Sequence, residues 1–137
     1  MPIGTDDFVS VQDFFGRYCW YIDEGDADAW LGLWAEDGEF TGLGAEVRGH
    51  AALRVIPTNS GRPGGPMRHT IANLHCDYAE ATDKVIARYY NMVTHWETSG
   101  AFTAMAMSTV TLRRNGKTWL IERSDTVMLP AKDGAAN

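Results

Sequence analysis

The order of the expected elements constrains the fold of this chain most. Segments with helical spacing come first, and four long segments typical of β-strands follow, at about 68–79, 84–97, 102–114 and 117–128. Dipeptides typical of hairpin turns separate these strands: Thr82-Asp83, Ser99-Gly100 and Asn115-Gly116. Helices followed by such an antiparallel meander predict an α+β fold, with the helices laid on one face of a curved sheet.

Helices are expected at three places before the long strands. The first, at about residues 6–24, places apolar side chains at three- and four-residue spacing: Phe8, Val11, Phe15, Tyr18, Cys19 and Ile22. Thr5 or Asp6 can cap its start, and Gly25 ends it. A second helix is expected at about 27–35, a short strand at 39–41, and a third helix at about 49–56, ended by Pro57. The Gly- and Pro-rich segment 58–66 is typical of a mobile flap over a cavity.

Length and composition predict one globular domain over residues 1–137, with a flexible tail at 131–137. The formal charge of −6 argues against nucleic-acid binding, because phosphate contacts need a basic patch. No apolar run is long enough for a membrane span, and the first residues lack the pattern of a signal peptide. Cys19 and Cys76 have no metal-ligand spacing. We therefore expect a cytoplasmic protein with free thiols that binds neither nucleic acid nor membrane.

Side chains from distant parts of the chain can form an acid–base site: Tyr18 and Asp23 in the first helix, His69 on a strand and Arg123 on the last strand. A carboxylate can fix the tautomer of a neighbouring imidazole and stabilise its protonated form, so that the imidazole can move a proton. Strand alternation groups His69 with Ile71, His75 and Asp77 on one face, and Arg123 with Trp119 and Ile121 on one face of the last strand. If His69 and Arg123 both point into the concave side, a substrate oxygen can lie between them.

Several motifs together resemble those of a known family. They are the run from Tyr18 to Trp30, the run from Trp34 to Phe40, Arg48-Gly49-His50, Arg68-His69-Thr70 and the run from Asn115 to Arg123. Over residues 8–128 the chain resembles the SnoaL-like branch of the nuclear-transport-factor-2-like superfamily. The resemblance implies a cone-shaped α+β barrel in which N-terminal helices and a curved, mainly antiparallel sheet enclose a deep pocket. It implies no single reaction, because members include dehydratases, a dehydrochlorinase, isomerases, cyclases, dioxygenase small subunits and proteins without known catalysis.

Asp23 and His69 match the Asp-His pair of particular enzymes in that superfamily. The spacing from Tyr18 to Asp23, and a strand that begins His-Thr, are similar to those of bile-acid 7α-dehydratase. Hexachlorocyclohexane dehydrochlorinase has the same pair and an Arg that falls on Arg123, but a Lys where this chain has Tyr18. The resemblance implies a cofactor-free lyase, in which His69 is the general base, Asp23 orients it, and Tyr18 and Arg123 bind developing negative charge.

The expected ligand is a hydrophobic, oxygenated small molecule, and no metal or cofactor is expected. Aromatic residues expected in the walls of the substrate pocket are Trp20, Phe40, Tyr89 and Trp119. Because helices can cover only one face of the meander, the other face is left open. Its apolar members, among them Met105 and Met107, predict a homodimer or a higher homo-oligomer.

Other interpretations of the same residues stay open. His69 can be a hydrogen-bonded strand histidine, Asp23 an ion-pair partner of Arg17 or Arg123, and Tyr18 a core residue. A ketosteroid-isomerase-like or polyketide-cyclase-like isomerase would recast Asp23 as the proton carrier and Tyr18 as an oxyanion donor. A non-catalytic small-molecule-binding module and a structural subunit of a larger dioxygenase are the remaining alternatives.

Overall fold

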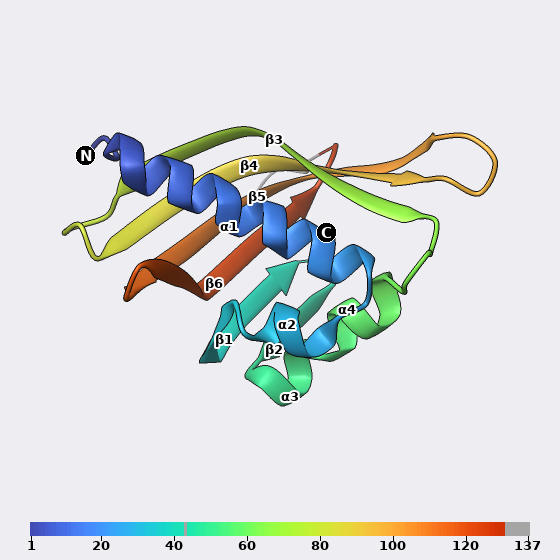
Figure 1. The fold of residues 1–137 in the computed structure, drawn as a ribbon, viewed down its shortest axis with the longest axis horizontal. Coiled ribbons are helices and arrows are strands. Elements are labelled where there is room, and N and C mark those ends of the chain that lie inside the picture. The colour runs from blue at the N-terminus through green and yellow to red at the C-terminus, as the bar shows by residue number, and fades with distance from the viewer. Residues whose placement is uncertain (43, 131–137) are drawn as a thin grey trace.

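The first helix lies across one face of a six-stranded sheet in the computed structural model (Figure 1). The structure describes residues 1–42 and 44–130, so the expected tail at 131–137 lies outside the described residues. The strands are β1 (Trp34–Gly42), β2 (Ala45–Arg48), β3 (Met67–Tyr78), β4 (Lys84–His95), β5 (Ala101–Asn115) and β6 (Thr118–Met128). Their order is β2-β1-β6-β5-β4-β3, antiparallel except for the β1–β6 pair. The α+β class is confirmed, but β2 and β3 form edges, so the sheet does not close into a barrel.

The helices differ from expectation mainly in their length. They are α1 (Thr5–Asp23), α2 (Ala27–Leu31), α3 (His50–Leu53) and α4 (Val55–Ser60). Gly25 adopts φ 67° after α1, and the Asp26 side chain caps α2 by accepting from the Ala29 N–H at 3.1 Å. α2 is shorter than expected because Trp34 already pairs with β6. Pro57 does not end a helix: it lies in the first turn of α4, where its missing N–H costs no helical hydrogen bond.

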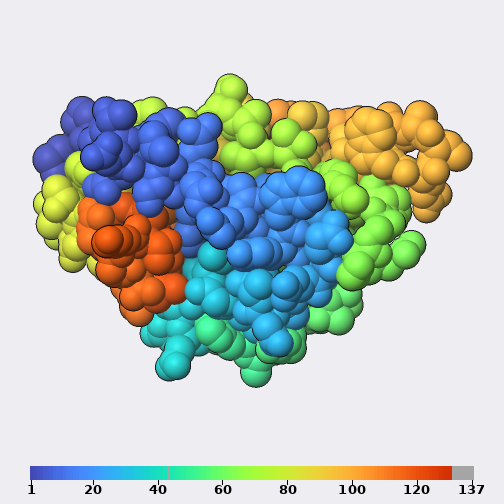
Figure 2. Space-filling model, in the orientation of Figure 1, coloured from blue at the N-terminus to red at the C-terminus, as the bar shows by residue number. Residues whose placement is uncertain are grey.

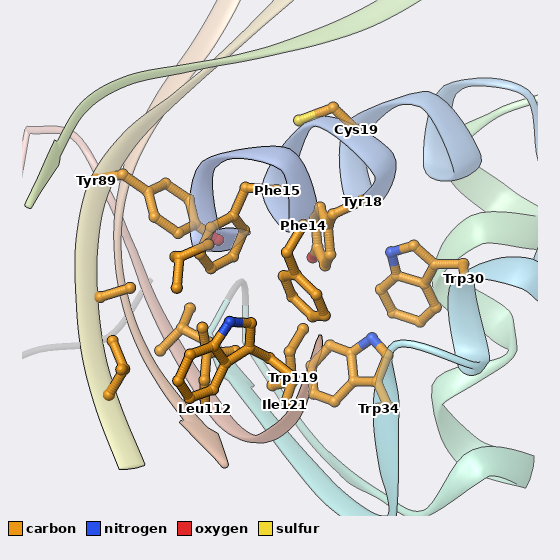
Figure 3. Packing of buried hydrophobic residues seen from close by; sticks show 14 of the residues in the cluster. Phe14, Phe15, Tyr18, Cys19, Trp30, Trp34, Tyr89, Leu112, Trp119 and Ile121 are labelled. Carbon is orange, nitrogen blue, oxygen red and sulfur yellow. The ribbon is translucent and has the colours of Figure 1, made fainter. Parts of the chain in front are cut away.

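Aromatic side chains fix α1 against the sheet (Figure 3). Phe14, Phe15 and Tyr18 point from α1 into a buried cluster that also holds Trp30 and Trp34. The ring centroids are 5.5 Å apart for Tyr18 and Trp30, and 5.1 Å apart for Trp30 and Trp34. Burial of each such side chain contributes about 1.5–3 kcal/mol. This packing sets the position of the C-terminal turn of α1, which lies beside β3.

A β-bulge in β3 changes which of its residues face the core. The pairing with β4 shifts between Ala72 and His75, and Asn73 within the shift adopts φ 56°. His69 lies on the concave side, whereas His75, after the bulge, is exposed. The prediction that one face holds both histidines was therefore wrong, because the inserted residue reverses the alternation.

A second register shift, between β5 and β6, has the same effect on the last strand. Leu112 pairs with Ile121, but Thr111 pairs with Arg123, so that Glu122 is the extra residue. Ile121 is buried before the shift, and Ser124 is buried after it. Arg123 therefore faces the outer side of the sheet, opposite to Ile121, and the predicted shared face is wrong here too.

The hairpin of β4 and β5 extends beyond the helices (Figures 1 and 2). Trp96 and Phe102 near its tip are exposed. The expected turns at Thr82-Asp83, Ser99-Gly100 and Asn115-Gly116 lie where the long strands end. No helix among the described residues has the length and apolar character needed to cross a membrane.

Candidate active site

Asp23 and His69 meet where the end of α1 contacts the start of β3. The Asp23 Oδ1 atom is 2.6 Å from His69 Nδ1. The same carboxylate accepts a hydrogen bond from the backbone N–H of His69, at 3.0 and 3.2 Å to its two oxygens. The Asp23 side chain is 5% exposed and the His69 side chain 10%. Because an ionised carboxylate only accepts, Nδ1 carries the ring proton, and a neutral His69 keeps its lone pair on Nε2.

A close backbone approach holds Asp23 in place. The backbone N–H of Arg62 donates to the main-chain oxygen of Asp23 at 3.1 Å. A Cβ atom on Gly61 would lie 1.9 Å from the main-chain oxygen of Ile22 and 2.6 Å from that of Asp23. Only glycine allows this contact, so the segment between α4 and β3 is tied directly to the last turn of α1.

His69 lines a cavity of about 100 Å³ on the concave side of the sheet. Its apolar wall consists of Ile22, Phe40, Ile56, Val93, Ala104, Ala106 and Met128. Its polar lining residues are Tyr18, Ser60, His69, Asn91, Ser108 and Thr126. Ligand pockets usually measure about 300–1,000 Å³. This cavity therefore suits a small ring or the reacting end of a larger molecule.

The polar groups of the wall differ in whether they have partners. The hydroxyls of Ser108 and Thr126 bond to each other at 3.0 Å. Burial raises the pKa of Tyr18 well above its usual value of 10, so its hydroxyl stays protonated and can donate. No residue in the described part of the chain bonds to Nε2 of His69. The lining of the cavity thus includes a hydroxyl that can donate and an imidazole whose second nitrogen has no partner among the described residues.

Arg123 does not join these residues. On the outer face, its Nη1 lies 3.0 Å from Glu39 Oε2 and its Nη2 lies 3.0 Å from Asp125 Oδ1. Its side chain is 47% exposed. The expectation that Arg123 points into the concavity is wrong, because the register shift in β6 turns it outward.

Of the four aromatic residues expected in the pocket walls, Phe40 lines the cavity. Trp20 is 66% exposed and borders an outer groove between α1 and β3. Tyr89 and Trp119 are core residues: the Tyr89 ring lies 4.8 Å from that of Phe15, and the Trp119 indole N–H donates to Ser10 Oγ at 3.1 Å. Trp20, Tyr89 and Trp119 are therefore not part of the cavity wall.

Asn91 is one of the wall residues that the sequence analysis missed. It lies on β4 beside Tyr90, Met92 and Val93, where a strand with one buried face favours an apolar residue. An asparagine in the middle of such a strand is the signal that could have marked it. Its backbone pairs with Ile71 on one side and Ala106 on the other, which places it in the wall near His69.

The cysteines and the possible metal ligands of the described residues bear on other kinds of catalytic chemistry. No group of three or more His, Cys, Asp or Glu side chains there is arranged to hold a metal ion. Cys19 and Cys76 are buried free thiols. Burial raises the pKa of Cys19 to about 12 and that of Cys76 to about 11, so neither is an activated nucleophile.

Comparisons with known proteins place the chain in a family. The SnoaL-like domain family matches residues 5–125. A Nostoc punctiforme protein of unknown function with a cystatin-like fold superposes with a TM-score of 0.81 at 18% identity, covering 95% of this chain and 96% of that chain. An NTF2-like protein from Novosphingobium aromaticivorans gives a TM-score of 0.77 at 25% identity, with 96% and 85% covered. A protein from the same bacterium, provisionally assigned as a scytalone dehydratase, superposes with a TM-score of 0.73 at 14% identity, covering 96% of this chain and 89% of that chain.

No curated protein matches the chain. The family match nevertheless covers most of its length, and the structural neighbours share the architecture of helices on an antiparallel sheet. This chain therefore belongs to the SnoaL-like domain family of the NTF2-like superfamily, which includes dehydratases, cyclases and isomerases.

Proposed function

We propose that this protein is a cofactor-free, dehydratase-like lyase that acts on a hydrophobic, oxygenated small molecule. The observation that carries the proposal is the buried pair of Asp23 and His69, with 2.6 Å between Oδ1 and Nδ1. The second ring nitrogen of His69 is left without a partner among the described residues, and His69 lines the cavity. A buried imidazole oriented by a carboxylate is suited to take a proton from a bound molecule.

The proposed reaction begins with removal of a proton from a carbon next to a carbonyl group. His69 Nε2 takes this proton, and the electron pair of the C–H bond moves into an enolate. Asp23 stabilises the imidazolium that forms. The enolate then expels the hydroxyl group on the next carbon, which accepts a hydrogen bond from Tyr18. The imidazolium proton joins the departing hydroxyl as water, so every group returns to its starting state. Positioned acid–base catalysis of this kind contributes about 10²–10⁴-fold.

The hydrogen bonds of Asp23 favour this scheme over an isomerase in which Asp23 itself carries the proton. Its carboxylate is already engaged by the ring and the backbone N–H of His69. Asp23 is also not among the described residues that line the cavity, whereas His69 is. A molecule bound in the cavity would therefore contact His69 and not the Asp23 carboxylate.

The test compares His69→Gln with wild type on a panel of β-hydroxy ketones. Elimination is followed by the absorbance of the conjugated product, and proton abstraction by deuterium exchange at the α-carbon in D₂O. His69→Gln is expected to lose about 10²–10⁴-fold in both. The control is His75→Gln, which changes an exposed histidine beyond the β3 bulge. Equal activity of His69→Gln and wild type would refute the proposal. Absence of both reactions in wild type would favour a binding module.

We also propose that the protein works as a cytoplasmic homodimer formed through the outer face of the sheet. Met105 and Met107 lie there, only partly buried, and the helices cover the opposite face. The free thiols of Cys19 and Cys76 suit a reducing compartment. Sedimentation velocity at micromolar concentration should show a dimer, and a monomer would contradict this proposal.

A further inference from the structure

Asn91 has unmet hydrogen bonds in the wall of the cavity. Its Oδ1 atom is fully buried, and no described residue donates to it. No described residue bonds to its side-chain nitrogen either. A buried carbonyl oxygen without a partner has lost its bonds to water without replacement, which costs stability. The side-chain nitrogen, for its part, is free to donate to a bound molecule.

The pairing of the strands places Asn91 near His69. His69 pairs with Val93 and Ile71 pairs with Asn91, so Asn91 is the diagonal neighbour of His69 on the same face of the sheet. Such diagonal neighbours have Cα atoms about 7–8 Å apart. The side chains beside Asn91 in the wall, those of Val93 and Ala106, are apolar. Asn91 therefore adds a polar amide close to His69 in an otherwise apolar part of the wall.

We propose that Asn91 binds the carbonyl oxygen of the substrate and so selects β-hydroxy carbonyl compounds. This inference rests on the proposed elimination and deepens it. When His69 Nε2 removes the α-proton, negative charge develops on the carbonyl oxygen one bond further along. The amide nitrogen of Asn91 donates to that oxygen, and the donation strengthens as the enolate forms. Tyr18 is then left to donate to the departing hydroxyl, and the proton taken by His69 leaves in the water formed.

The substrate-free test uses 4-nitrophenolate, a one-ring oxyanion that stands in for the enolate. Its binding is followed by the change in its visible absorbance at millimolar concentration. Wild type is expected to bind it, and Asn91→Leu, which has a similar volume but no polar atom, is expected to bind about tenfold more weakly. The same variant should melt at an unchanged or higher temperature, because a buried oxygen without a hydrogen-bond partner has been removed.

A control in the same wall separates binding from packing. Thr126→Val removes a hydroxyl that is already paired with Ser108, and it should lower the melting temperature. The inference is overturned if wild type does not bind 4-nitrophenolate or if Asn91→Leu binds it equally well. It is also overturned if Asn91→Leu both binds more weakly and melts several degrees lower, because this result marks a structural residue.

The two proposals fail in different ways. If Asn91→Leu behaves as expected but His69→Gln leaves elimination and deuterium exchange unchanged, Asn91 remains a binding residue and the lyase proposal fails. If His69→Gln abolishes both reactions but Asn91→Leu binds 4-nitrophenolate normally, the lyase proposal stands and the role of Asn91 fails.

Discussion

The Asp23→Asn variant is expected to move the ring proton of His69 from Nδ1 to Nε2. In the wild type, the carboxylate can only accept, so Nδ1 donates to it across 2.6 Å. In the variant, the amide oxygen is needed by the backbone N–H of His69, which lies 3.0 Å from one carboxylate oxygen. The amide nitrogen then faces Nδ1 and must donate to it. The proton consequently moves to Nε2, and this nitrogen can no longer accept a proton.

The size of the effect follows from the burial of the pair. With Asp23 5% exposed and His69 10% exposed, solvent screens their hydrogen bond very little. Loss of a hydrogen bond to a charged group costs about 1.5–3 kcal/mol of unfolding free energy. Loss of the Nε2 lone pair removes the proposed general base, so proton abstraction should fall by about 10²–10⁴-fold. Urea denaturation measures the first effect, and deuterium exchange the second.

The tautomer can be observed without a substrate, by long-range ¹H–¹⁵N NMR of protein labelled at histidine. His50 is an internal reference, because its Nε2 lies 3.0 Å from the main-chain oxygen of Trp34 and must donate to it. Wild type should therefore show His69 protonated at Nδ1 and His50 protonated at Nε2. An Nε2–H signal from His69 in the wild type, or an unchanged tautomer in Asp23→Asn, would refute the reasoning.

Gly61→Ala is expected to cost about 1–3 kcal/mol, because its Cβ would lie 1.9 Å from a main-chain oxygen of α1. Gly16→Ala is the matched control, because an added Cβ atom there would have no heavy atom within 4 Å. It should stabilise the helix by about 0.5–1 kcal/mol. Urea denaturation measures the unfolding free energy of both variants. Arg123→Gln should change the unfolding free energy by about 0–1 kcal/mol and leave deuterium exchange unaltered; a large loss of exchange would show that the outward arginine reaches the site. Burial raises the pKa of both Tyr18 and Tyr89 above the usual 10, so the unfolded chain releases these protons first. The contribution of these two protonated tyrosines to the unfolding free energy is therefore complete below about pH 10 and is lost as the pH rises further. Urea denaturation curves recorded at increasing alkaline pH should show this loss.

Much of the fold was predictable because it depends on local patterns. The apolar spacing of α1 and the turn residues at Asn115-Gly116 act over a few neighbouring residues. The short strand β2 was missed, since the alternation of apolar and charged residues in Ala45–Arg48 extends over only four residues and their burial is slight. β1 was expected only at residues 39–41, because its first half pairs with β6, more than 80 residues away in the chain.

The candidate site was predictable only up to the β-bulges. His69 lies before the register shift in β3, and Asp23 lies on the buried face of α1, so strand alternation and helical spacing were each enough to indicate their orientation. Arg123 follows the shift in β6, and the rule therefore assigned it to the wrong face. Such bulges depend on how two strands pair, which the sequence of one strand does not encode. Asn91 was overlooked for a different reason: its importance comes from missing partners, and these exist only in the folded chain.

The double attachment of Asp23 to His69 means that selection can act on the two residues for different reasons. The Asp23 carboxylate bonds to the backbone N–H of His69, a group that every residue except proline supplies at position 69. A relative without the proposed lyase activity would still gain stability from an aspartate that bonds the edge strand to the first helix. The imidazole of His69 makes no hydrogen bond to any described residue other than Asp23, so it has no comparable structural role. In related sequences, a histidine at this position is therefore the better marker of the proposed activity, and an aspartate without this histidine indicates only the shared fold.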